Sequence, residues 1–84
     1  MDEFNTKILN RLMEECEDVE TYAKLSEQAD EKGYNVLATK LESIAYDEYT
    51  HAYALKTCLE RWGYDIGATA REKFERATVT FKSL

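Results

Sequence analysis

Two acidic residues and the only histidine of the chain have the types and the spacing that could bind a metal ion. Glu48 and His51 are three positions apart, so on a helix their side chains would project from the same face. Glu15 lies 33 positions before Glu48. Carboxylate oxygens together with an imidazole nitrogen suit iron, and the same ligand types also accept manganese or zinc. We therefore take Glu15, Glu48 and His51 as the candidate metal-ligating and catalytic residues.

The elements that must position these residues are helices, because the chain contains no proline and no alternating strand pattern. Its three glycines lie where the helical periodicity breaks, which is the position expected for C-terminal helix caps. These glycines are Gly33, Gly63 and Gly67. The predicted helices cover about residues 3–32, 35–62 and 68–82. The sequence thus predicts one all-α domain over residues 1–84, with an antiparallel two-helix hairpin and a short C-terminal helix that packs on it.

Each predicted helix carries a stripe of mostly apolar residues at spacings of three and four, and these stripes are interpreted as inward-facing. The first comprises Ile8, Leu12, Glu15, Val19, Tyr22, Ser26 and Ala29. The second comprises Leu37, Leu41, Ile44, Glu48, His51, Leu55, Cys58 and Trp62. The third is weaker and comprises Ala70, Phe74, Ala77 and Phe81.

The three candidate ligands are predicted to meet at one level of the hairpin. Glu15 lies 18 residues before Gly33 and His51 lies 18 residues after it, so each stands about 27 Å from the turn, with Glu48 at about 22 Å. Carboxylates in a helical core are costly unless they are paired or bound to metal. One Glu from one helix and a Glu-x-x-His from the next form half of the ligand set of a carboxylate-bridged di-metal centre.

A second copy of the chain would complete this ligand set. One chain offers two stripe carboxylates and one imidazole, which are too few for two iron atoms, whereas a two-fold partner doubles both numbers. A chain this short buries only about 60–65% of its unfolded surface, so a partner would also stabilise the fold. We expect a homodimer or a higher homo-oligomer that forms a four-helix bundle.

Two segments of the chain resemble the ferritin-like superfamily, closest to its rubrerythrin branch. They are Glu15–Tyr22, with sequence ECEDVETY, and the later EYTH that begins at Glu48. In that family a Glu of the first helix lies seven residues before a Tyr, and a Glu-x-x-His follows on the second helix at a comparable spacing. The resemblance covers about residues 5–62 and leaves the last 22 residues outside it. A full rubrerythrin domain carries the motif twice, whereas this chain carries it once. In this it is similar to the encapsulated ferritins, in which a dimer of two-helix chains rebuilds the bundle and places the di-iron site across its interface.

The resemblance implies an iron-binding ferroxidase that oxidises Fe(II) to Fe(III) with dioxygen or peroxide, in iron storage or detoxification. The alternative enzyme is a rubrerythrin-like peroxide reductase. It would need an external electron donor, because Cys16 and Cys58 cannot form the four-cysteine rubredoxin domain that such enzymes carry. A third hypothesis is a metal-free helical oligomer that acts as a scaffold, whose stability and assembly metal would not change.

Four further residues are candidates for supporting roles. Glu14 and Glu17 flank Glu15, where encapsulated ferritins keep carboxylates that guide iron to the centre; a solvated acidic face is the alternative. Tyr22 and Tyr49 could hydrogen-bond a ligand or supply an electron during oxidation; packing is the alternative. The remaining acidic neighbours are interpreted as solvated surface only, and they are Asp18, Glu20 and Asp47.

The composition excludes several partners and predicts a cytoplasmic protein. A net charge of −6 without a basic cluster argues against nucleic acid and anionic membranes, and no apolar run approaches the length of a membrane span. The first residues lack the pattern of a signal peptide, and two unpaired cysteines suit a reducing compartment. The tail, residues 77–84, has a faint likeness to peptides that direct cargo into an encapsulin shell, which is a further candidate partner and compartment. Packing of a helix end through Phe74 and Phe81 is the preferred interpretation of this tail.

Overall fold

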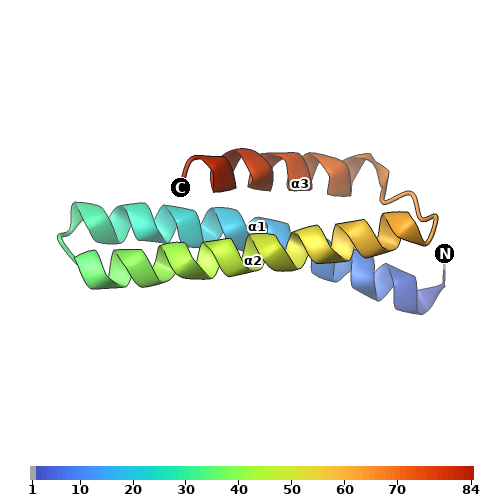
Figure 1. The fold of residues 1–84 in the computed structure, drawn as a ribbon, viewed down its shortest axis with the longest axis horizontal. Coiled ribbons are helices and arrows are strands. Elements are labelled where there is room, and N and C mark those ends of the chain that lie inside the picture. The colour runs from blue at the N-terminus through green and yellow to red at the C-terminus, as the bar shows by residue number, and fades with distance from the viewer. Residues whose placement is uncertain (1) are drawn as a thin grey trace.

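Three helices make up the regular structure of residues 2–84, the part of the chain that the computed structural model describes. Helix α1 spans Glu3–Glu31, α2 spans Asn35–Arg61 and α3 spans Gly67–Lys82. The first two form a long antiparallel hairpin, and α3 lies along one side of it (Figure 1). None of these described helices combines the length and the apolarity needed to cross a membrane. The predicted all-α hairpin with a short third helix is confirmed, and each helix begins and ends within one residue of its predicted segment.

Glycines in the left-handed backbone region end the two long helices. Gly33 has a φ of +80°, and its N–H donates to the carbonyl of Asp30 at 3.0 Å. Gly63 plays the same part after α2 with a φ of +84°. The position of Gly67 predicted a C-terminal helix cap, and this prediction is wrong. Gly67 begins α3 instead, where its N–H donates to the carboxylate of Asp65 at 2.9 Å and holds the connection in a tight bend.

The stripe predicted for α1 faces inward. Its buried members are Leu12, Glu15, Val19, Ser26 and Ala29. The hydroxyl of Ser26 donates to the carbonyl of Ala38 at 2.8 Å and so joins α1 to α2 inside the hairpin. Ile8 and Tyr22 are half-buried. The α1 prediction is therefore confirmed.

Helix α2 turns different residues inward from those predicted. Its buried residues recur every seven positions and are Ala38, Ala45, Ala52 and Leu59. Members of the predicted stripe are half-buried or exposed in the single chain, with Leu37 49%, Ile44 38% and Trp62 64% exposed. The prediction that this stripe faces inward is wrong for the single chain, because α2 packs mainly through alanines and the stripe lies about a quarter turn around the helix from them. We call these apolar residues the open stripe: Leu37, Leu41, Ile44, Leu55, Cys58 and Trp62.

Aromatic packing joins α3 to α2. Phe74 and Phe81 stack on Tyr49 with ring centroids 5.5 Å and 4.2 Å away, and the hydroxyls of Tyr49 and Thr78 are 3.0 Å apart. Ala70 and Ala77, the remaining members of the predicted α3 stripe, are buried. The tail is therefore helical up to Lys82 and packs on α2, which agrees with its preferred interpretation as a helix end that packs through Phe74 and Phe81. Association with an encapsulin shell stays a prediction.

The two cysteines have opposite surroundings, although both are free thiols. Cys16 is fully buried in the cluster that joins the three helices, and burial, with a contribution from nearby Glu20, raises its pKa to about 11. Cys58 is exposed on the open stripe. Only Cys58 is therefore accessible to solvent.

Candidate metal centre

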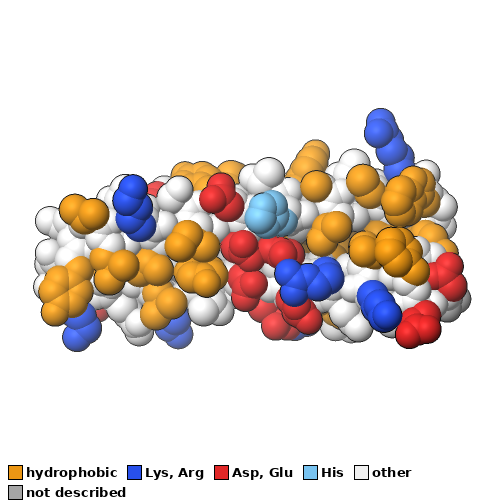
Figure 2. Space-filling view, turned by 90° about the horizontal axis from the view of Figure 1, so that it is seen from below, with side chains coloured by type: hydrophobic (Ala, Val, Ile, Leu, Met, Phe, Trp, Pro, Cys, Tyr) orange, Lys and Arg blue, Asp and Glu red, His pale blue; other side chains and the backbone are white. Residues whose placement is uncertain are grey.

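Glu15, Glu48 and His51 meet midway along the hairpin. Figure 2 shows the only histidine of the chain beside a group of acidic side chains on the side away from α3. Glu15 projects from α1, and the other two project from successive turns of α2. One ligand atom from each residue lies within 4.8 Å of the others. Their similar distances from the turn at Gly33 explain why the antiparallel hairpin brings them to one level.

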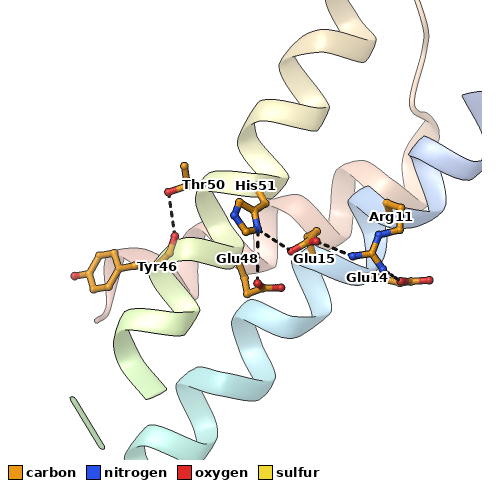
Figure 3. A network of polar contacts seen from close by, with 7 residues as sticks. All are labelled: Arg11, Glu14, Glu15, Tyr46, Glu48, Thr50 and His51. Atoms are coloured by element: carbon orange, nitrogen blue, oxygen red, sulfur yellow. Dashed lines mark hydrogen bonds and ion pairs between the residues drawn. The ribbon is translucent and has the colours of Figure 1, made fainter. Parts of the chain in front are cut away.

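The imidazole lies at the solvent edge of the cluster, over two more buried carboxylates. His51 Nδ1 is 3.4 Å from Oε2 of Glu15 and 3.6 Å from Oε1 of Glu48 (Figure 3). The side chain of His51 is 56% exposed, whereas those of Glu48 and Glu15 are 17% and 9% exposed. The carboxylates therefore form the floor of the site, and the imidazole forms its rim.

The two oxygens of Glu15 have different surroundings. Oε1 accepts a hydrogen bond from Nη2 of Arg11 at 3.0 Å, and the same guanidinium also contacts Glu14 (Figure 3). Oε2 is buried and has no hydrogen-bond partner among the described residues. A buried carboxylate oxygen without a partner is costly, and a cation bound beside it removes that cost.

The cluster holds more negative charge than its surroundings favour. The neighbouring Glu15 carboxylate, then burial, then the nearby Asp18 raise the pKa of Glu48 to about 8. Burial alone would raise the pKa of Glu15, but the neighbouring side chains of Glu48 and His51 and the positive charges of His51 and Arg11 together lower it. At neutral pH the carboxyl of Glu48 is therefore mostly protonated beside the ionised carboxylate of Glu15. A metal cation at this position would replace the proton of Glu48 as the group that relieves the repulsion.

Three features of the site thus fit a transition metal: an unpartnered buried oxygen, a second carboxylate beside it and an imidazole at hydrogen-bonding range. Hard oxygen donors with one nitrogen donor match iron, manganese or zinc. A single chain supplies too few ligands for two such ions, and one Glu with a Glu-x-x-His matches half of the ligand set of a ferritin-like di-metal centre.

The rubrerythrin family model matches residues 8–83 of the chain. The chain belongs to the rubrerythrin family. The match reaches through α3, so the expectation that the last 22 residues lie outside the resemblance is wrong. No curated protein and no solved structure matches the chain significantly.

Sequence reasoning missed two residues that contact the centre of this rubrerythrin-family chain. Asp18, interpreted as solvated surface, is half-buried and within hydrogen-bonding reach of Glu48. It lies three residues after Glu15 on α1, and this spacing was the available signal. Arg11 lies four residues before Glu15 and engages it directly. On an acidic helix both residues have the pattern of solvent-exposed charges, which hid their role.

The four residues predicted to support the centre are placed around it rather than in it. Glu14 contacts Arg11, and Glu17 pairs with Lys73 of α3, so each already has a cationic partner. Tyr49 directs its hydroxyl to Thr78 of α3 and not to a ligand. Tyr22 is half-buried on the α1 stripe. Roles in guiding iron or in electron supply stay predictions for all four.

The centre of this rubrerythrin-family chain lies within an uncovered apolar surface. Glu48 and His51 belong to the same face of α2 as the open stripe, with Ile44 on the side toward the turn and Leu55 on the other side. Hydrophobic side chains lie on both sides of the acidic cluster and the histidine in Figure 2. An exposed apolar surface of this kind, rimmed by polar groups, marks an interaction site.

Proposed function

We propose that two copies of this rubrerythrin-family chain join through the open stripe and oxidise Fe(II) to Fe(III) at a di-iron centre that they share. The observation that carries the proposal is the convergence of Glu15, Glu48 and His51 around an unpartnered buried oxygen. Iron is the substrate in this proposal, and the activity would serve iron storage or detoxification. Membership of the rubrerythrin family supports the choice of iron, since di-iron binding is what the ferritin-like resemblance implies.

The number of ligands supports a shared centre. Two copies would supply four carboxylates from Glu15 and Glu48 and two imidazoles from His51, which is the composition of the ferritin-like di-iron carboxylate site. The location of the cluster supports it too, because a two-fold axis that passes beside the cluster would bring both ligand sets together. The same contact would cover the open stripe of each copy.

The residues of each chain have distinct parts in this proposal. Glu15 presents Oε2 to the metal, because Arg11 already holds Oε1. Glu48 gives up its proton when the metal binds and becomes a second anionic ligand. His51 contributes an imidazole nitrogen from the edge of the cluster. A bound iron pair supplies the electrons that reduce dioxygen or peroxide.

Anaerobic Fe(II) loading of the size-separated protein, followed by exposure to air, tests this proposal. We expect one tightly bound iron per chain, confined to dimers or larger species, and a ferric absorbance after air is admitted. His51→Ala and Glu48→Ala should abolish oxidation and keep the helical circular dichroism. Glu27→Ala, which removes an exposed carboxylate elsewhere on α1, is the matched control and should behave as the native chain. A folded oligomer without stoichiometric iron would overturn the ferroxidase assignment.

The family match also supports a second candidate, a peroxide reductase that receives electrons from a separate donor protein. The two activities differ in their oxidant. Stopped-flow mixing of the reduced iron-loaded protein with peroxide and with dioxygen separates them: a much faster reaction with peroxide supports the reductase, and comparable or faster reaction with dioxygen supports the ferroxidase.

A further inference from the structure

Arg11 occupies a position that the metal-binding residues alone do not explain. Its Nη2 lies 3.0 Å from Oε1 of Glu15, and its Nη1 contacts Glu14. Among residues 2–84, no other Lys or Arg lies within ion-pair distance of Glu15 or Glu48. The guanidinium is thus the one fixed positive charge in contact with the carboxylates of the centre.

Because of this contact, the two oxygens of the Glu15 carboxylate have different functions. A guanidinium stays charged at any relevant pH and binds carboxylates in a rigid planar geometry. While Arg11 holds Oε1, the other oxygen is left unpartnered and 3.4 Å from Nδ1 of His51. The carboxylate can then offer one oxygen to a cation, and it can offer both only if Arg11 is released.

We propose that Arg11 is a positioning residue of the metal centre, which holds Glu15 as a one-oxygen ligand and competes with the metal for the second oxygen. This inference rests on the metal site of the proposed function, but not on iron oxidation. In the metal-free protein, Arg11 offsets part of the repulsion among Glu14, Glu15 and Glu48. In the metal-bound protein, the same charge opposes the cation and limits how many oxygens Glu15 supplies.

Co²⁺ is a suitable probe, because it accepts the same donors and its visible absorption weakens as its coordination number rises. Arg11→Gln frees Oε1 and removes a positive charge close to the ion. We expect this variant to bind Co²⁺ about tenfold more tightly, the order produced by removal of one unit charge near a divalent ion. We also expect a weaker visible absorption per bound ion, because Glu15 can now use both oxygens.

Two further variants separate charge from geometry. Arg11→Lys keeps the charge but lacks the planar fork that spans Glu14 and Glu15. It should reproduce the spectral change with a smaller gain in affinity. Arg76→Gln alters the net charge by the same amount on α3, at a residue without an ion pair in the described structure, and should match the native chain in affinity and spectrum.

Thermal unfolding provides a readout that does not depend on activity. Competition between Arg11 and metal for Glu15 is reciprocal, so loss of one partner must alter the effect of the other. Without metal, Arg11→Gln should unfold at a lower temperature than the native chain. The rise in unfolding temperature on saturation with Co²⁺ should be larger in the variant than in the native chain.

The outcomes distinguish the inference from the proposed function. A native chain that binds Co²⁺, together with an Arg11→Gln variant that binds it equally or more weakly, or that shows the native spectrum, overturns the role of Arg11 and leaves the metal site standing. A native chain that binds neither Co²⁺ nor Fe²⁺ overturns both.

Discussion

The hairpin of α1 and α2 has one face covered by α3 and one face left open, and the two faces use different residues. Small side chains of α2 such as Ala45 and Ala52 are fully buried in the packed hairpin, and Cys16 of α1 is buried in the same core as residues of α3. The open face carries the open stripe and the cluster of Glu15, Glu48 and His51. The first face buries small side chains, whereas the second has exposed large apolar side chains and a buried carboxylate oxygen without a partner.

One partner surface would satisfy both the exposed apolar side chains of the open face and the incomplete ligand set of the site. Full burial of a large aliphatic side chain contributes about 1.5–3 kcal/mol, and the residues of the open stripe reach only part of it in a single chain. The oxygen of Glu15 that lacks a partner lies at the centre of this same surface. A second copy would both cover the apolar residues and complete the ligand set.

The largest effect is expected from a charge in the open stripe. Ile44→Lys places an ammonium where the proposed partner packs, and an unpaired buried charge costs at least about 3 kcal/mol, equivalent to a more than about hundredfold rise in the dimer dissociation constant. Sedimentation velocity measures the shift to monomer. Val79→Lys, at an exposed apolar residue of α3, is the control and should leave assembly unchanged. Equal assembly of both variants would place the interface elsewhere.

Metal binding at the open face should stabilise the folded chain by slightly less than the cost of the charge in Ile44→Lys. A metal that binds only the folded state stabilises it by about 2.7 kcal/mol at one hundred times its dissociation constant. Zn²⁺, a redox-inert probe, should therefore raise the denaturation midpoint of the native chain, and chelation should reverse the rise. The effect should disappear in His51→Ala and persist in Glu27→Ala. Absence of any effect in the native chain would favour the metal-free scaffold.

Overpacking at the buried alanines of α2 should lower the free energy of unfolding by less than metal binding raises it. Ala52 is fully buried, so Ala52→Leu inserts three carbons where α2 packs most closely and should lower the free energy of unfolding by about 2 kcal/mol. Ala54→Leu makes the same chemical change at an exposed position of α2 and is the matched control. Chemical denaturation followed by circular dichroism measures both. Equal stability of the two variants would contradict the close packing inferred for this face.

The smallest effect is expected from the hydroxyl that faces α3. Tyr49→Phe removes the bond to Thr78 and should lower the free energy of unfolding by about 1 kcal/mol. Because that hydroxyl points away from the ligands, the rate of Fe(II) oxidation should not change. A slower oxidation with unchanged iron binding would instead support Tyr49 as an electron source.

The sequence predicted the helices and the meeting of the ligands, because helical rise and glycine positions set both. It did not predict which side of α2 faces inward. That helix carries apolar residues on two sides, and periodicity alone cannot tell the stripe that contains Ala45 from the one that contains Ile44. It also did not single out Arg11 and Asp18, since a charged side chain that reaches a ligand has the same local pattern as one that reaches water. Such contacts depend on side-chain direction and on the neighbouring helix.

The unequal burial of the two thiols gives the chain a built-in chemical reporter. Alkylating reagents attack the thiolate, which is scarce at neutral pH when the pKa is about 11, as for buried Cys16. Cys58 is exposed on the open stripe, seven residues beyond His51. Reagent uptake by the unmodified chain therefore reports on Cys58 alone. If copies associate through the open stripe, the alkylation rate will fall as the protein concentration rises.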